Sequence, residues 1–222
     1  MWTLSTCGAR SCRPTSGEVL ERATYHHGDL RNALVAAAST AVRAAGPHDL
    51  SVREIAREVG VSPNAAYRHF AGRDELLATV AEGARGAVGA AMAAGRAQVP
   101  PSDDALTLAR ARLAAVGRGY VEYAVAEPGL FGVAFGEPPQ GKGAPGCVGG
   151  PDPWSMLQGA LDELDAAGGL GLRGRAYADT AAWAAVHGLA LLLVGPLAGL
   201  DAEAREQALV RVLATVGAGL AG

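Results

Sequence analysis

Cysteine is scarce in this chain of 222 residues, and its placement is unsuited to a disulfide framework. The three cysteines, Cys7, Cys12 and Cys147, are odd in number and widely scattered. This argues against a small disulfide-stabilised scaffold and fits a reducing compartment. The N-terminus also lacks a basic segment followed by an apolar run, so we expect no signal peptide and a cytoplasmic location.

Motifs of common hydrolases and metalloenzymes are absent as well. The sequence contains no G-x-S-x-G, no H-E-x-x-H and no C-x-x-C. Two stretches imitate nucleotide-binding loops, but GEPPQGKG (136–143) has Gly143 where a P-loop carries Ser or Thr for Mg²⁺. The second, GLGLRG (169–174), follows a helical segment rather than a strand. We therefore predict no enzyme activity, no cofactor and no metal site.

Only one apolar run raises the question of a membrane span, residues 181–200. It contains His187 and is broken by Gly195-Pro196, and Ala-rich helices of this kind are common at soluble interfaces. We predict no membrane insertion. Because no segment shows the alternating pattern of a strand, the sequence predicts an all-α protein of about nine helices.

The expected helices divide into two domains behind a tail. Residues 1–24 combine Gly, Pro, Ser and Thr without a sustained period, which predicts a disordered tail of unknown role. In a domain of residues 25–73 we expect helices over 29–45, 51–59 and 62–70. A helix over 72–95 should lead into a second domain of residues 74–222. There we expect further helices over 105–127, 129–135, 154–167, 175–195 and 201–219. A Gly/Pro-rich loop at 136–152 interrupts the second domain.

Charge is spread unevenly along the chain. The formal net charge is −3, with +1 on residues 1–90 and −4 on residues 91–222. A weak basic bias at one end suits a DNA-reading module on a neutral body, but does not establish one by itself.

The most informative stretch is SVREIAREVGVSPNAAYRHF, residues 51–70. Ser51 and Glu54 have the spacing of a capping box, and Gly60 stands where a left-handed residue ends a helix. Ser62 and Pro63 then have the order of a helix cap and a first helical position. Two helices this short are not stable alone. The pattern predicts a helix-turn-helix whose second helix enters the DNA major groove.

Several motifs resemble the TetR family of bacterial transcriptional regulators. The segments YHHGDLRNALVAAASTAVRAAG and LSVREIAREVGVSPNAAYRHFAGRDELLATVA, within about residues 25–82, are similar to the family's DNA-binding region. YVEYAVAEPGLFGVAF (120–135) is similar to a stretch common in its second domain, and WAAVHG (183–188) resembles the W-x-x-x-H-G signature of one C-terminal domain class. The resemblance implies a homodimeric repressor that leaves its (pseudo)palindromic operator when a small molecule binds.

The start of the expected recognition helix supplies the candidate base contacts. Asn64 can pair with adenine, and Arg53 on the preceding helix either pairs with guanine or lies on a solvated surface. Pro63 and Ala65 offer only apolar contact, as with a thymine methyl group, so part of the specificity is expected from DNA shape.

Other polar side chains are candidates for the phosphate backbone. The resemblance assigns this role to Tyr67, His69 and Arg73, each of which can donate a hydrogen bond to a phosphate oxygen. Arg68 faces either DNA or solvent, and His26 and His27 match the family's entry segment. The predicted DNA-binding set is Ser51, Arg53, Ser62, Pro63, Asn64, Ala65, Tyr67, Arg68, His69 and Arg73.

The second domain carries aromatic residues with few charges between them, which suits an apolar effector pocket between helices. The candidates are Tyr120, Tyr123, Phe131, Trp154, Trp183 and His187, with ordinary core packing as the alternative interpretation. The last two expected helices are rich in Ala, Leu and Val, and two such helices per subunit predict a four-helix homodimer interface.

Three other functions remain open at this level. Operator position decides whether such a protein represses or activates, and the residues do not encode it. A ligand-binding protein on a degenerate helix-turn-helix scaffold is a further alternative, as is a small helical enzyme. The polar residues expected at the DNA are intact, which favours the regulator.

Overall fold

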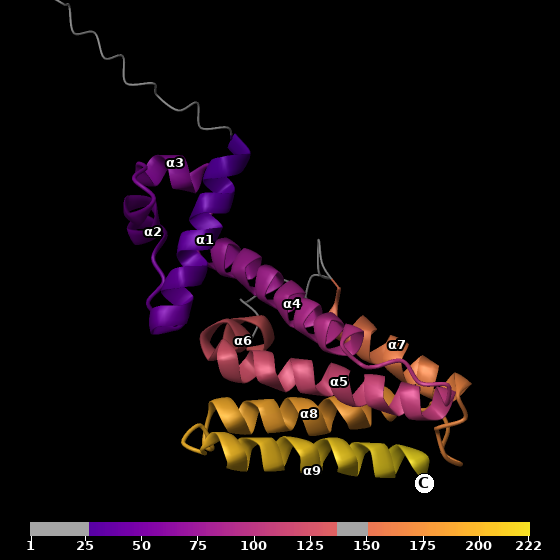
Figure 1. Ribbon diagram of the computed structural model, residues 1–222. Coiled ribbons are helices and arrows are strands. Elements are labelled where there is room, and N and C mark those ends of the chain that lie inside the picture. Colours follow the sequence, from indigo (N-terminus) through magenta and orange to yellow (C-terminus); the bar gives the residue numbers. More distant parts are fainter. Residues whose placement is uncertain (1–26, 137–150) are drawn as a thin grey trace, which may run out of the picture.

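The computed structural model describes residues 27–136 and 151–222, and all regular structure in these ranges is helical (Figure 1). The helices are α1 (His27–Ala45), α2 (Val52–Glu58), α3 (Pro63–Tyr67), α4 (Arg73–Ala97), α5 (Ala105–Ala126), α6 (Pro128–Phe135), α7 (Pro153–Ala166), α8 (Ala178–Val194) and α9 (Ala202–Ala221). The all-α prediction is confirmed. The expected tail, His26, the three cysteines and most of the P-loop-like stretch lie outside the described residues.

The helix-turn-helix forms where the local signals predict it. Gly60 ends α2 with a φ of +78°, a left-handed conformation that glycine adopts without strain. The Ser62 hydroxyl accepts a hydrogen bond from the Ala65 N–H at 3.3 Å, and Pro63 opens α3. Buried Ala66 and Phe70 then anchor this segment in the core of the N-terminal domain.

Two details of this motif differ from the prediction. The expected capping box is wrong, because Ser51 makes no side-chain cap hydrogen bond and Glu54 instead pairs with Arg57 at 3.8 Å. The second helix ends at Tyr67 rather than at residue 70. The N–H groups of Arg68 and His69 bond to carbonyls three residues back, which tightens the chain into a turn.

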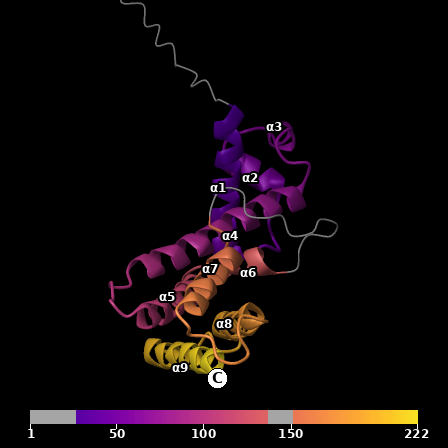
Figure 2. The ribbon, with the colours of Figure 1, turned by 90° about the vertical axis from the view of Figure 1, so that its right-hand side faces the viewer.

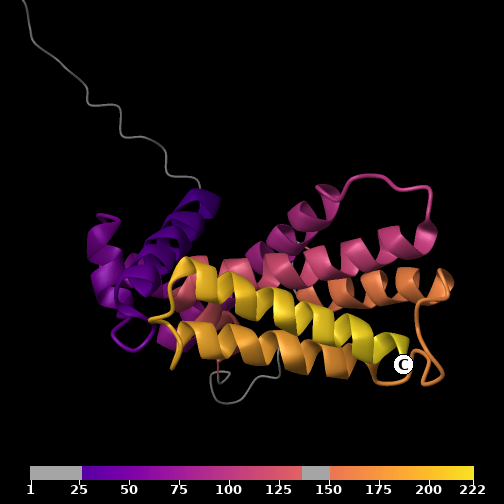
Figure 3. The same ribbon diagram turned by 60° about the horizontal axis from the view of Figure 1, so that its bottom comes forward.

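Helix α4 links this small domain to the larger bundle (Figure 1). Leu76 and Val80 near its start lie in the N-terminal core, whereas Val88 and Met92 near its end lie in the core of the bundle. Helix α5 is central to the bundle and packs against α4, α7, α8 and α9. Helices α8 and α9 run side by side as an outer layer (Figures 2 and 3).

The short helix α6 packs against both domains. Leu130 and Ala134 on α6 are buried in the N-terminal core. At Gly129 the helix approaches α1 so closely that a Cβ atom there would lie 2.6 Å from the Val42 carbonyl oxygen. This packing fixes α6 against α1 and the first half of α4.

The apolar run at 181–200 contributes to a helix of the bundle. Helix α8 ends at Val194, and the backbone turns at Gly195. Among the described residues, we find no helix with the length and apolar character needed to cross a bilayer.

Candidate nucleic-acid interface and ligand cavity

The helix-turn-helix presents an exposed polar surface at the end of the molecule remote from α8 and α9 (Figure 1). Arg53, Ser62, Pro63, Asn64 and Arg68 are exposed, and Tyr67 is 41% exposed. An open shallow groove runs between α2 and the start of α3, with Ser51, Arg53, Arg57 and Pro63 among its lining residues. A short helix whose first residues, Ser62 to Asn64, are exposed fits the floor of a DNA major groove.

Arg73 has a structural contact that the sequence did not indicate. Its Nη2 atom donates a hydrogen bond to the Pro47 carbonyl at 2.6 Å, and Nη1 lies 3.5 Å from the Asp74 carboxylate. The side chain therefore ties the turn after α1 to the first residue of α4. A substitution at Arg73 would disturb this tie as well as any phosphate contact.

Arg31 was missed by sequence reasoning, although it covers Phe70 in the turn that follows the recognition helix. Its guanidinium carbon lies 4.9 Å from the centre of the Phe70 ring, and its Nη2 donates to the Thr79 hydroxyl at 3.4 Å. No spacing in the sequence links Arg31 to Phe70, because the contact depends on how α1 crosses the turn that follows α3.

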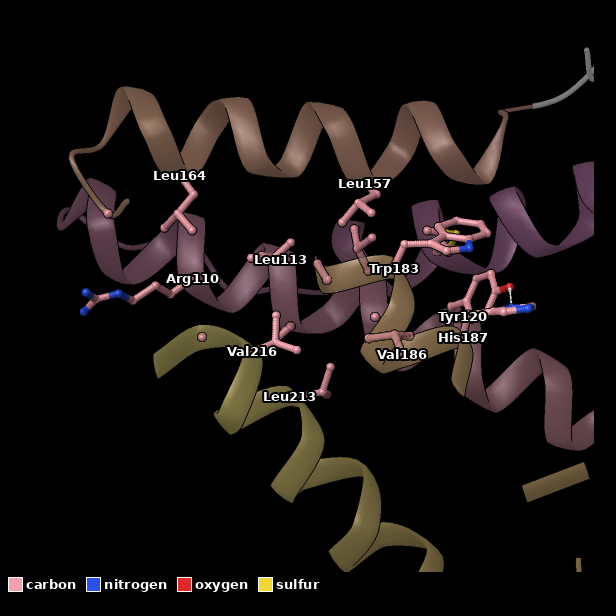
Figure 4. Close-up of a pocket in the computed structure, with 17 residues that line it drawn as sticks. Arg110, Leu113, Tyr120, Leu157, Leu164, Trp183, Val186, His187, Leu213 and Val216 are labelled. Carbon is pink, nitrogen blue, oxygen red and sulfur yellow. Dashed lines mark hydrogen bonds between the residues drawn. The ribbon is translucent and has the colours of Figure 1, made fainter. Parts of the chain in front are cut away.

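A largely apolar cavity of about 70 Å³ lies inside the bundle (Figure 4). Its walls come from α4, α5, α7, α8 and α9 and from the turn after α7. The lining residues are Met92, Arg110, Leu113, Ala114, Val116, Gly117, Tyr120, Leu157, Leu164, Gly169, Ala182, Trp183, Val186, His187, Leu213, Val216 and Gly217. A partly open apolar space with a few convergent polar groups is typical of a small-molecule site.

The polar groups at one end of the cavity are hydrogen-bonded to one another. The Tyr120 hydroxyl lies 2.8 Å from His187 Nδ1 (Figure 4). Burial raises the pKa of the Tyr120 phenol and lowers the pKa of the His187 imidazole. Both shifts favour the neutral forms, and the imidazole tautomer sets whether the phenol or Nδ1 donates the hydrogen bond.

Three of the six predicted pocket residues line this cavity, namely Tyr120, Trp183 and His187. Phe131 and Trp154 lie behind them, with ring centres 5.5 Å from Tyr120 and Trp183, respectively. Tyr123 is half-buried and is not among the lining residues. Phe131 therefore belongs to the packed core, as the alternative interpretation has it. Trp154 packs against Trp183 on the side that faces away from the cavity.

Because its pKa is lowered, His187 should make the stability of the folded protein depend on pH. The unfolded chain takes up a proton near the ordinary histidine pKa of 6.5, whereas the folded chain resists protonation until lower pH. The stability that this site contributes is present above that value and is lost as pH falls toward the folded-state pKa. Between about pH 7.5 and 5.5, the melting temperature should fall more in the parent protein than in His187→Gln. Parallel thermal melts of the two proteins would test this, and an identical pH dependence would contradict it.

Two family models match different parts of the chain. A family model described as "Bacterial regulatory proteins, tetR family" matches residues 34–80, which span α1 to the first part of α4. A second model, "Tetracyclin repressor-like, C-terminal domain", matches residues 113–216, which include most of the cavity wall. No curated protein sequence matches the chain significantly.

Solved structures share the fold over most of the chain. A protein with unknown function from Rhodococcus sp. RHA1 is 31% identical, with a TM-score of 0.67 over 90% of this chain and 100% of its own. A protein assigned to the TetR family of transcription regulators from Shewanella sp. PV-4 is 17% identical, with a TM-score of 0.54 over 86% and 97%. RolR, in complex with resorcinol, is 18% identical, with a TM-score of 0.53 over 86% and 89%.

An exposed helix-turn-helix joined by a long helix to a helical domain with a cavity defines a DNA-binding transcription regulator. The chain belongs to the TetR family of bacterial regulatory proteins. Among the described residues, no cluster of His, Cys, Asp and Glu could hold a metal ion.

Proposed function

We propose that the protein is a homodimeric, sequence-specific repressor that leaves its operator when a small molecule occupies the cavity. Residues 25–73 read DNA, and residues 74–222 bind the effector and the second subunit. The protein is located in the cytoplasm, because that is where its operator DNA lies. The observation that carries the proposal is the course of α4, which begins in the same core as Ala66 of the recognition helix and contributes Met92 to the cavity wall.

The size of the cavity supports release by a conformational change. At about 70 Å³ it has roughly half the ~150 Å³ of an apolar cavity that holds benzene. An effector must therefore displace lining side chains, and Met92 on α4 is one of them. Effector binding favours the conformation in which these side chains are displaced. A shift of α4 then changes the distance between the recognition helices of the two subunits. That distance must be about 34–36 Å for the two helices to fit successive major grooves. RolR shows that a protein of this fold binds a small phenol, resorcinol.

The outer surface of α8 and α9 supports the homodimer. Leu191 and Leu192 on α8, Leu197 in the following turn and Val210 on α9 are exposed large apolar side chains. They lie among Ala and Gly residues that permit close helix packing. A second copy related by a two-fold axis would cover this face and form a four-helix interface.

Two substitutions separate sequence reading from backbone attachment. Asn64→Ala should weaken binding to the cognate duplex by about 1–3 kcal/mol while leaving scrambled DNA unaffected, because a bidentate contact to adenine is lost. Tyr67→Phe should weaken binding to both duplexes alike, because a phosphate contact carries no sequence information.

The cognate duplex is first obtained by selection from a random pool, and binding is then titrated at fixed salt. Equal losses on both duplexes for Asn64→Ala would refute the assignment of roles. A protein that stays monomeric and binds no DNA at low salt would refute the proposed function.

A further inference from the structure

Of the described residues that line the cavity, one side chain carries a charge. Arg110 is that residue, and no carboxylate is present among them (Figure 4). The other lining residues are aliphatic, aromatic or glycine, apart from the neutral His187. A binding site with one fixed positive charge and an apolar wall selects ligands by the charge of a single head group.

Arg110 is an exposed residue at the end of the cavity lining that is remote from the Tyr120–His187 pair, and its guanidinium points away from the other lining side chains (Figure 4). It also lines a shallow surface groove between α5 and α9 that shares Ala114, Leu213 and Gly217 with the cavity. Arg110 and Tyr120 are ten residues apart on one helix, which corresponds to about 15 Å along its axis. The cavity therefore has an inner aromatic end and an outer charged end.

The two ends of the cavity differ in whether their polar groups already have a hydrogen-bond partner. At the inner end the Tyr120 hydroxyl and His187 Nδ1 satisfy each other at 2.8 Å. At the outer end the exposed Arg110 guanidinium makes no hydrogen bond or ion pair with any residue that the structure describes. The Asp104 carboxylate does act on Arg110 through space, but its oxygens already accept from Leu106 and Thr107 at the start of α5.

We propose that the effector is an amphipathic anion, with an apolar body in the cavity and a carboxylate on Arg110. This inference rests on the proposed function of the cavity. A guanidinium and a carboxylate form paired, charge-assisted hydrogen bonds, which a neutral head group does not match. A cationic head group would be repelled at the same position.

The wall next to Arg110 is the part of the bundle best suited to open for such a ligand. Only Leu209 of α9 is buried, whereas Leu213 and Val216 are half-buried where they face the cavity. Within one subunit, the α9 side of the cavity buries less side-chain surface than the α4 and α7 sides, whose cavity-facing residues Met92, Leu157 and Leu164 are buried. The ligand therefore enters between α5 and α9, and its apolar body then displaces Met92. The anion on Arg110 would then lie at the opened edge, in contact with water.

The test compares an acid with the alcohol of the same chain length. Dodecanoate and 1-dodecanol are titrated below their aggregation limits against the full-length protein, Arg110→Gln and Arg173→Gln. Arg173 is an exposed arginine outside the cavity lining, so its variant controls for the loss of one positive charge. We expect the parent protein and Arg173→Gln to prefer the acid by about threefold to fivefold, because the ion pair with an exposed guanidinium is screened by water. Arg110→Gln should bind the alcohol unchanged and lose the preference.

Three results would overturn the inference: equal affinity for acid and alcohol, an acid preference that survives in Arg110→Gln, or no binding of either compound. Operator release is measured in parallel and reports on the proposed function separately. If the alcohol releases the operator as effectively as the acid, the effector cavity stands and the role of Arg110 fails. If the acid binds through Arg110 and the operator stays bound, the anion site stands and release by this ligand fails.

Discussion

Phe70→Ala should abolish operator binding by unfolding the N-terminal domain. The Phe70 ring is 1% exposed and lies in a core built from α1, α2, α4 and α6. Removing a buried phenyl ring costs about 3–5 kcal/mol, from lost burial and from the cavity that remains. Natural domains have a total stability of about 5–15 kcal/mol, so this loss is a large part of the whole. The Arg31 guanidinium would also lose the ring that it covers.

Urea unfolding and operator titration of the same preparation measure the two effects together. Phe70→Leu is the matched control, because leucine keeps the site apolar and fills most of it, at a cost below about 1.5 kcal/mol. Hydrogen exchange would locate the damage, with faster exchange expected in α1 to α3 and unchanged exchange in α8 and α9. A fully folded Phe70→Ala protein that still binds its operator would show that this core does not hold the recognition helix.

Gly129→Ala should lower both stability and operator affinity, whereas Gly132→Ala three residues later in α6 should not. A Cβ atom at Gly129 would lie 2.6 Å from the Val42 carbonyl oxygen, a contact that forces α6 away from α1. Overpacking of this kind costs about 1–3 kcal/mol. At Gly132 a Cβ atom meets nothing within 4 Å, and alanine favours the helix by up to about 1 kcal/mol.

The pair thus separates close packing from helix propensity on a single helix. Thermal melts give the stability of each variant, and titration with the selected operator gives the affinity. The ion pair between Arg43 Nε and Glu127 Oε2, at 2.8 Å, joins α1 to the residue before α6 and should loosen in Gly129→Ala. Similar behaviour of the two alanine variants would contradict the role assigned to the α1–α6 contact.

The parts of the fold that depend on neighbouring residues were predictable from the sequence. Gly60 ends α2 with a positive φ, Ser62 caps α3, and Asp104, Asp152 and Asp201 cap later helices, because each signal acts within one helical turn. The capping box failed because Glu54 has a competing partner, Arg57, on its own helix. The exposed positions of Arg53 and Asn64 followed from the same local pattern, although their contacts with DNA remain predictions.

The cavity depends on how distant helices are aligned, which a single sequence does not specify. Arg110, Leu157 and Leu213 lie on three helices and meet around one space. Aromatic residues were chosen as pocket candidates because of their side-chain type. Phe131 and Tyr123 nevertheless do not line the cavity, whereas Gly117 does. A Cβ atom at Gly117 would lie 2.7 Å from Leu213 Cδ2, so the absence of a side chain there lets α5 and α9 approach. A missing side chain leaves no chemical pattern from which to predict it.

The packing of α6 has a consequence for protein engineering. Leu130 and Ala134 complete a core whose other residues come from α1 to α4, although some fifty residues of chain separate them from Leu77 and Val80. A chimera that transplants only the segment up to the start of α4 onto a foreign sensor would leave an apolar hole where α6 belongs. Exchange of DNA specificities within this family is therefore better designed as a graft of the α2–α3 surface alone, with the α1–α4–α6 scaffold of the recipient retained.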